Sequence, residues 1–248
     1  MPTYAADWIV TTDGCDRKGR ISIPYLCSLL QETATMHANE LGWGYADLKA
    51  EGLQWVLSRQ WVRVESLPRW LETVRVETWP SGRSALTWAR DYRVLNGGGD
   101  LIGVATSLWF VMDRKTRRPR PAPFGADMDL SSAEKVREGD LKALPEADAP
   151  EKSGSVVAGY HDIDFHAHVN NVRYLKWILD SLDPDFLDER VLGELEINFL
   201  AEGFLGDGLD VFSGGSGNTR DMSLMRRSDG TELCRMKASW NPLASSNP

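Results

Sequence analysis

A dense group of titratable side chains lies in the second half of this 248-residue chain. Three of its four histidines and two aspartates fall within eight positions: His161, Asp162, Asp164, His166 and His168. Imidazole and carboxylate groups can exchange protons near neutral pH, as the general acid–base catalysis of a hydrolysis requires. A purely structural turn has little use for so many ionisable groups, so we interpret this segment as a catalytic turn.

The turn leads directly into an amphipathic helix that ends near Pro184. Apolar residues recur at i, i+3, i+4 and i+7, which predicts one buried face: Leu175, Ile178, Leu179 and Leu182. The N–H groups at the start of this helix, around Val169 to Asn171, together with the positive end of its dipole, can stabilise a developing oxyanion. We therefore expect the helix to position the chemistry of the turn.

The same segment carries a family resemblance through the pattern D-x-D-x-x-x-H-V-N-N-x-x-Y, here Asp162, Asp164, His168, Val169, Asn170, Asn171 and Tyr174. It resembles the catalytic segment of the acyl-acyl-carrier-protein thioesterases. The resemblance implies an α+β tandem hot-dog fold, with two antiparallel sheets that each wrap a long helix and are related by a pseudo-two-fold. It also implies hydrolysis of fatty acyl-ACP thioesters to free fatty acid and carrier thiol, with no metal or cofactor.

Two alternatives to this function remain open. A similar H-V-N-N turn occurs in hot-dog thioesterases that act on coenzyme A esters, so an acyl-CoA thioesterase is the rival within enzymes. A non-catalytic acyl-binding hot-dog protein is the rival from another class. The partner is accordingly expected to be acyl carrier protein or a coenzyme A thioester.

Composition limits the classes of function. A net charge of −8 argues against a general nucleic-acid binder, and no apolar run approaches the length that spans a membrane. The first residues show neither a secretory signal nor a transit pattern, so we expect a cytoplasmic location. Cys15, Cys27 and Cys234 match neither a disulfide framework nor a zinc site and are expected to be free thiols.

A turn, a long helix and several strands occur twice in the chain. Tyr25-Leu26 and Leu29-Leu30 match Tyr174-Leu175 and Ile178-Leu179 at a separation of 149 residues, and Val76 matches Val211 at 135. We therefore predict an N-terminal, pocket-forming hot-dog unit over residues 1–123, a linker with room for one short helix over 124–153, and a C-terminal, catalytic unit over 154–248. Such a fused pair imitates a two-fold dimer within one chain, and a further homodimer remains open.

The first unit is expected to begin with a strand from Tyr4 to Val10 and a helix from about Ser22 to Leu41. The inner face of this helix is predicted to hold Leu26, Leu29, Leu30 and Thr33, with His37 packed on the same face rather than catalytic. Four strand segments follow, at 55–57, 61–64, 74–76 and 101–111.

The repeat predicts a single active site. At a separation of 149 residues, Gly19 stands where His168 stands and Arg17 stands where His166 stands. The first half therefore has no imidazole at the equivalent turn.

The resemblance implies roles for four residues. Glu202, which resembles the family's strand-borne glutamate, is the expected base for the attacking water, and Asp164 is the alternative base. His168 is expected to orient or polarise the thioester carbonyl, and Asp164 to hold the turn by hydrogen bonds. The family usually has asparagine where this chain has His166, which can donate one hydrogen bond as an amide does. Plant members carry a cysteine where this chain has Gly203, so direct attack by water is favoured over a covalent route.

A basic segment stands out in an otherwise acidic protein. Five positive charges fall within seven residues: Arg114, Lys115, Arg117, Arg118 and Arg120. The family has a Thr-Arg-Arg segment after its first sheet, matched here by Thr116-Arg117-Arg118. Charge complementarity predicts that an acidic carrier protein docks on Arg114, Lys115, Arg117 and Arg118, although the same residues can hold the phosphates of coenzyme A.

Overall fold

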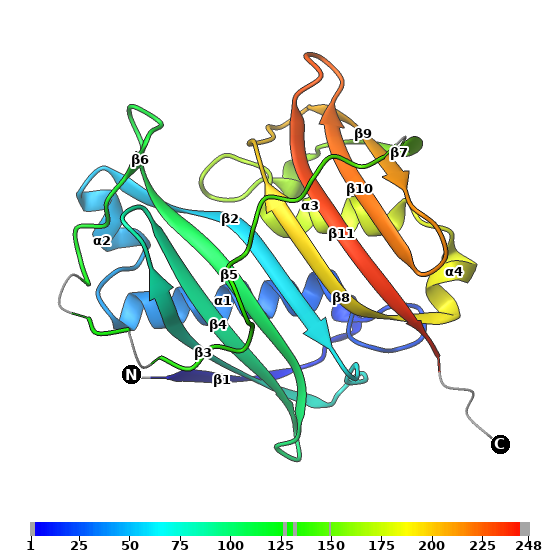
Figure 1. Cartoon of the computed structure of the whole chain (residues 1–248), viewed down its shortest axis with the longest axis horizontal. Helices are drawn as coiled ribbons and strands as arrows, with labels where there is room; N and C mark the ends of the chain where they lie inside the picture. Colours follow the sequence, from blue (N-terminus) through cyan, green and yellow to red (C-terminus); the bar gives the residue numbers. More distant parts are fainter. Residues whose placement is uncertain (1–2, 126–127, 131–132, 149, 244–248) are drawn as a thin grey trace. The chain divides into compact units, whose positions relative to one another are not determined.

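The computed structural model of the protein describes residues 3–125, 128–130, 133–148 and 150–243. By its internal contacts the chain divides into two compact units, residues 1–141 and 142–248. Each unit consists of an antiparallel sheet and helices (Figure 1).

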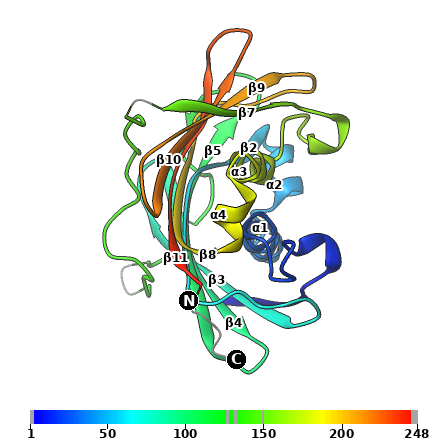
Figure 2. The ribbon, with the colours of Figure 1, turned by 90° about the vertical axis from the view of Figure 1, so that its right-hand side faces the viewer.

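The first unit is an antiparallel sheet with a long helix on one face (Figure 2). Its elements are β1 (Tyr4–Ile9), the 3₁₀ turn η1 (Thr12–Gly14), α1 (Ile23–Glu40), α2 (Tyr45–Ala50), β2 (Leu53–Val64), β3 (Thr73–Arg83), β4 (Thr87–Asn96), β5 (Leu101–Asp113) and β6 (Pro119–Arg120). The strands lie in the order β1-β3-β4-β5-β2, and the short β6 pairs with β5.

The second unit repeats this plan. Its elements are β7 (Glu151–Val157), η2 (Tyr160–Asp162), α3 (Asn171–Asp180), α4 (Pro184–Asp188), β8 (Arg190–Phe199), β9 (Gly208–Gly214), β10 (Thr219–Arg226) and β11 (Glu232–Pro242). The strand order β7-β9-β10-β11-β8 is that of the first unit, element for element. The predicted double occurrence of turn, helix and antiparallel sheet is therefore confirmed.

Amphipathic sequence patterns explain both helices. In α1 the predicted inner residues Leu26, Leu29, Leu30 and Thr33 are all buried. Ser22 caps the helix by accepting the N–H of Tyr25 (3.3 Å), and Pro24 lies in its first turn. In the second unit Leu175, Ile178, Leu179 and Leu182 are buried as predicted. One boundary was wrong, because α3 ends at Asp180 and Pro184 begins α4 instead.

The strands follow the expected alternation, with two corrections. Val74 and Val76 in β3 are buried while Arg75 between them is exposed. The segments 55–57 and 61–64 are one continuous strand, β2, because a bulge between Leu57 and Arg59 lets the ladder with β5 continue. The expected strands also missed β4, which pairs with both β3 and β5.

The segment predicted as a linker packs on the first unit as far as Leu141, whereas Leu144 N–H donates to Asn198 Oδ1 of the second unit (2.6 Å). Trp79 Nε1 donates to the Glu134 carbonyl (2.8 Å), and Val136 N–H donates to Asp91 Oδ2 (3.1 Å). Leu141 is buried in a cluster with Trp61. No helix occurs in the described part of residues 124–150. The predicted division at 123 and 154 stays a prediction.

Within the described residues, no helix has both the length and the apolar character needed to cross a membrane.

His37 is packed in the core of the first unit, as expected, with 2% of its surface exposed. Its Nδ1 lies 2.9 Å from Arg90 Nη1, and its ring stacks on Tyr4 with ring centroids 5.6 Å apart. Burial, reinforced by the charge of Arg90, lowers the pKa of His37 from 6.5 to about 4. The unfolded chain therefore binds a proton at this position in a pH range where the folded chain does not.

This difference predicts a specific loss of stability in acid. Neutral His37 makes its full contribution to the free energy of unfolding above pH 6.5, and this contribution is lost as the pH falls toward 4. Across this pH range, urea denaturation should show that the free energy of unfolding of the wild type falls by up to about 3 kcal/mol more than that of His37→Gln. This estimate follows because each pKa unit corresponds to about 1.4 kcal/mol. Parallel pH curves for the wild type and the variant would contradict the prediction.

Candidate active site

Asp164 organises the turn that precedes α3. Its Oδ1 accepts the backbone N–H groups of His166 (2.8 Å) and His168 (3.4 Å), and its own N–H donates to the His168 carbonyl (2.8 Å). Ala167 closes the turn by donating to the Asp164 carbonyl (3.0 Å) and has a left-handed φ of 65°. These bonds fix the backbone that carries both imidazoles.

The first unit contains the same turn without its imidazoles. Asp16 Oδ1 accepts the N–H groups of Lys18 (2.9 Å) and Arg20 (2.9 Å), and Asp16 N–H donates to the Arg20 carbonyl (2.7 Å). Gly19 takes the left-handed position with φ of 71°. The Arg20 guanidinium forms an ion pair with Asp16, at 2.7 Å from Nε to Oδ2.

Comparison of the two turns corrects the register of the repeat. The hydrogen bonds align Asp16 with Asp164, a separation of 148 residues rather than 149. Arg20, not Gly19, therefore stands where His168 stands, and Lys18, not Arg17, stands where His166 stands. The first turn still has no imidazole.

The structure brings Glu202 to His168. His168 Nδ1 lies 3.4 Å from Glu202 Oε1, and their side chains are 21% and 32% exposed. The Phe204 ring lies against the imidazole with centroids 5.4 Å apart and planes at 78°. The pair is thus open to a substrate yet partly shielded from water, which strengthens its electrostatic interactions.

Two hydrogen bonds hold the chain next to Glu202. Val169 N–H donates to the Gly203 carbonyl (2.8 Å), and Gly203 N–H donates to Tyr174 Oη (2.6 Å). Tyr174 is 2% exposed, and this burial raises the pKa of its phenol. Tyr174 is the last residue of the D-x-D-x-x-x-H-V-N-N-x-x-Y pattern, but no role for its hydroxyl could be predicted from the sequence.

The same contacts explain the glycine at 203. A Cβ at this position would lie 2.9 Å from Tyr174 Oη and 3.1 Å from a methyl group of Val169. In the first unit Ile21 N–H donates to the Pro68 carbonyl (2.7 Å), as Val169 does to Gly203. This separation of 135 residues puts Leu67 where Glu202 stands, so the first unit lacks the carboxylate as well.

The expected oxyanion donors need correction. Val169 N–H is taken by the Gly203 carbonyl, and Asn170 N–H donates to the Asp162 carbonyl (2.9 Å). These two bonds stabilise the turn. Of the three N–H groups expected to bind an oxyanion, only that of Asn171 is left for this role. Asn170 caps α3 by accepting the N–H of Val172 (2.9 Å).

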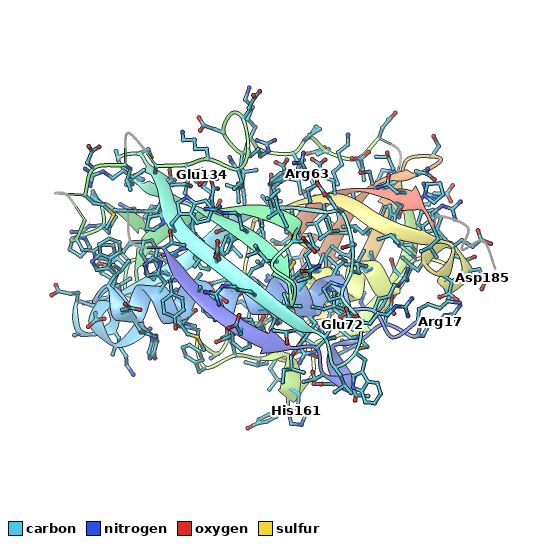
Figure 3. The ribbon with its side chains drawn as sticks, turned by 90° about the horizontal axis from the view of Figure 1, so that it is seen from below. Arg17, Arg63, Glu72, Glu134, His161 and Asp185 are labelled. Atoms are coloured by element: carbon cyan, nitrogen blue, oxygen red, sulfur yellow. The ribbon has the colours of Figure 1, made fainter. Side chains whose placement is uncertain are left out.

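The remaining histidines of the turn lie in different environments. His166 is half-buried, and its ring lies 4.4 Å from that of Phe165. A catalytic role for His166 stays a prediction. His161 is exposed and projects outward (Figure 3).

The basic segment forms the turn between β5 and β6. Asp113 N–H donates to the Arg118 carbonyl (3.0 Å), and Arg117 N–H donates to the Asp113 carbonyl (2.9 Å). Lys115, Arg117 and Arg118 are exposed, while Arg114 is half-buried. A compact turn thus presents three exposed positive side chains.

Neither a metal site nor a reactive thiol emerges from the described residues. Within them, no group of three or more His, Cys, Asp or Glu side chains is arranged to hold a metal ion. Burial raises the pKa of Cys27 to about 12 and also raises that of Cys234, which disfavours their thiolates.

Two family models match the chain. The acyl-ACP thioesterase N-terminal domain matches residues 2–123, and the acyl-ACP thioesterase C-terminal domain matches residues 146–242. The chain is similar to a chloroplastic palmitoyl-acyl carrier protein thioesterase of Gossypium hirsutum, with 30% identity over 89% of this chain. It is 28% identical to a chloroplastic acyl-[acyl-carrier-protein] hydrolase of Cuphea viscosissima over 92% of its length. The matched region spans 59% of each of these relatives.

Solved structures share the fold. A crystal structure described as an acyl-ACP thioesterase from Bacteroides thetaiotaomicron superposes with a TM-score of 0.88 and 25% identity, covering 96% of this chain and 98% of that one. The 12:0-ACP thioesterase of Umbellularia californica superposes with a TM-score of 0.81 and 22% identity, covering 97% of both chains. The predicted tandem hot-dog fold is confirmed.

Proposed function

Because this chain belongs to the acyl-ACP thioesterase family, we propose that it hydrolyses fatty acyl thioesters of acyl carrier protein to a free fatty acid and the carrier thiol. The observation that carries the proposal is the approach of His168 Nδ1 to Glu202 Oε1, at 3.4 Å, beside the start of α3. In the first unit, Arg20 and Leu67 stand at the positions equivalent to His168 and Glu202.

The geometry favours a different catalytic role for each of His168 and Glu202. The Nδ1 side of the His168 ring faces Glu202 Oε1. His168 donates from Nε2 to the thioester carbonyl, while Glu202 removes a proton from the attacking water. The tetrahedral oxyanion is stabilised by His168 and by the N–H of Asn171. When it collapses, the carbon–sulfur bond breaks and the proton on Glu202 passes to the leaving thiolate.

Acyl carrier protein is the proposed carrier because relatives are named for it and because the β5–β6 turn is basic. The exposed side chains Lys115, Arg117 and Arg118 offer positive charge on a protein of net charge −8. Such a local patch attracts an acidic partner and raises its association rate.

The test compares one acyl chain on two carriers. Free-thiol release should be measured with acyl carrier protein and with coenzyme A, using wild type and Arg117→Glu/Arg118→Glu. We expect kcat/KM for the carrier-protein substrate to fall at least about 10-fold at low salt, as loss of electrostatic steering predicts. The coenzyme A substrate should change much less.

A second variant with two charge reversals is the matched control. Lys142→Glu/Lys237→Glu changes the net charge equally at exposed positions of the second unit and should leave the carrier-protein rate nearly unchanged. Equal losses for both double variants would refute docking at the β5–β6 turn. Tight acyl binding without turnover in wild type would instead favour the non-catalytic binding protein.

The cytoplasm is the proposed compartment, supported by three cysteines that remain free thiols.

A further inference from the structure

Glu202 lies outside regular secondary structure, between β8 and β9, and not on a strand as the resemblance implied. Upstream of it, the N–H groups of Leu200 and Ala201 both donate to the Leu233 carbonyl, at 2.9 and 3.2 Å. Downstream, Gly203 is held by Tyr174 and Val169. A catalytic side chain on such a segment depends on other groups for its position, because no strand ladder continues through it.

Arg226, at the end of β10, contacts this segment with its guanidinium. Nη2 donates to the carbonyl of Glu202 itself. Nε forms an ion pair with Asp207 Oδ2 (3.0 Å), and the same oxygen accepts the N–H of Phe204 (2.9 Å). On its other edge, Nη1 forms an ion pair with Asp229 Oδ2 (3.0 Å). One planar group thus ties the residues around Glu202 to the β10–β11 turn.

Arg226 also reaches His168 through an aromatic ring. Its guanidinium carbon lies 5.7 Å from the ring centroid of Phe204, whose other neighbour is the His168 imidazole, 5.4 Å away. Cation–π attraction of this kind orients a ring. The guanidinium thus contacts the Glu202 carbonyl directly and reaches His168 through the Phe204 ring.

The first unit offers an internal comparison. Asn96 occupies the position of Arg226, because Asn96 N–H donates to the Asp100 carbonyl (3.0 Å) as Arg226 N–H does to that of Thr231 (2.8 Å). The Asn96 side chain caps its own turn by accepting the N–H groups of Gly98 and Asp100. Of the two equivalent positions, the one in the unit that carries Glu202 thus holds the arginine.

We propose that Arg226 is a positioning residue that holds Glu202 and Phe204 in place around His168. This proposal rests on the proposed function of the His168–Glu202 pair. Arginine suits the task because its rigid planar group donates several hydrogen bonds in fixed directions, whereas lysine carries a single flexible ammonium.

The first test is kinetic. Arg226→Ala should lower kcat for the acyl-carrier-protein substrate by about 10²-fold, a typical effect of misplacing a reacting group, with KM changed less than about 3-fold. Arg226→Lys should lose about 10-fold, because charge remains but the geometry does not. The neighbouring Arg227 is the matched control, since it is 46% exposed against 14% for Arg226, and Arg227→Ala should stay within about 2-fold of wild type.

The second test asks whether Arg226 acts through Glu202. In a Glu202→Gln background, Arg226→Ala should cost less than about 3-fold, because the group that it positions is already disabled. An equal loss in both backgrounds, or no loss in wild type, would overturn the proposal. If Arg226→Ala does not fold, Arg226→Lys takes its place in the cycle.

A spectroscopic measurement separates this proposal from the proposed function. The NMR signals of the His168 ring should shift in Arg226→Ala toward those of Glu202→Gln, and should not shift in Arg227→Ala. This readout needs no turnover. A wild type that binds acyl chains without hydrolysing them would refute the proposed function, whereas unchanged His168 signals in Arg226→Ala would refute the positioning role.

Discussion

Glu202→Gln is expected to lower kcat for thioester hydrolysis by about 10²–10⁴-fold, the usual contribution of a general base. The amide has the shape of the carboxylate and can remain beside His168, but it cannot remove a proton from water. KM should change little, because the substrate still binds between unaltered surfaces. Rates of free-thiol release with saturating and with limiting substrate provide both constants.

A glutamate on the strand before the site provides the control. Glu194 lies in β8 and is exposed, so Glu194→Gln removes the same charge without touching the pair. This variant should keep nearly full activity. If both variants retained wild-type kcat, Glu202 would not be the base, and the approach of His168 to Glu202 would have to be structural.

His168 and Glu202 illustrate what the sequence could predict. The titratable turn and the amphipathic helix are local patterns, and the resemblance added Glu202 to the same site. Their approach to 3.4 Å depends on hydrogen bonds made by Gly203 with Val169 and Tyr174. These bonds join residues 29 or more positions apart, and residue types alone do not predict which distant groups will meet.

The register of the repeat shows a different limit. A separation of 149 pairs Tyr25 with Tyr174, two identical residues, whereas the backbone pairs Leu26 with Tyr174 at 148. Both Leu26 and Tyr174 are buried, while Tyr25 is only half-buried. Identity of residue type thus misled the alignment by one position. The turn itself, with a left-handed residue at Gly19 and at Ala167, defines the true register.

Arg226 was beyond sequence analysis for a related reason. It stands beside Arg227 at the end of a strand, and nothing in the sequence distinguishes the two. Only the fold brings Arg226 to the Glu202 carbonyl and Asp207, while Arg227 remains exposed. Long-range contacts between short polar segments carry no periodicity, so a pattern of residue types cannot predict them.

Asp164→Ala is expected to reduce kcat by about 10²-fold because it releases the turn that positions His168. Removal of the carboxylate leaves the N–H groups of His166 and His168 without their acceptor, at a cost of about 1–3 kcal/mol in the free energy of unfolding. Asp164→Asn retains an oxygen that can accept both bonds. Its kcat should therefore stay within about 10-fold of wild type if the carboxylate serves the turn.

The turn of the first unit makes this experiment decisive between the two candidate bases. Asp16 makes the same backbone hydrogen bonds where neither histidine nor glutamate is present, which indicates that an aspartate here is needed for the turn itself. Asp16→Ala should therefore destabilise the protein about as much as Asp164→Ala, measured by urea denaturation, yet leave kcat close to wild type. If Asp164→Asn instead lost as much activity as Asp164→Ala while Glu202→Gln remained active, the base would be Asp164. A large loss in Glu202→Gln with a mild one in Asp164→Asn would assign proton removal to Glu202 and the shape of the turn to Asp164.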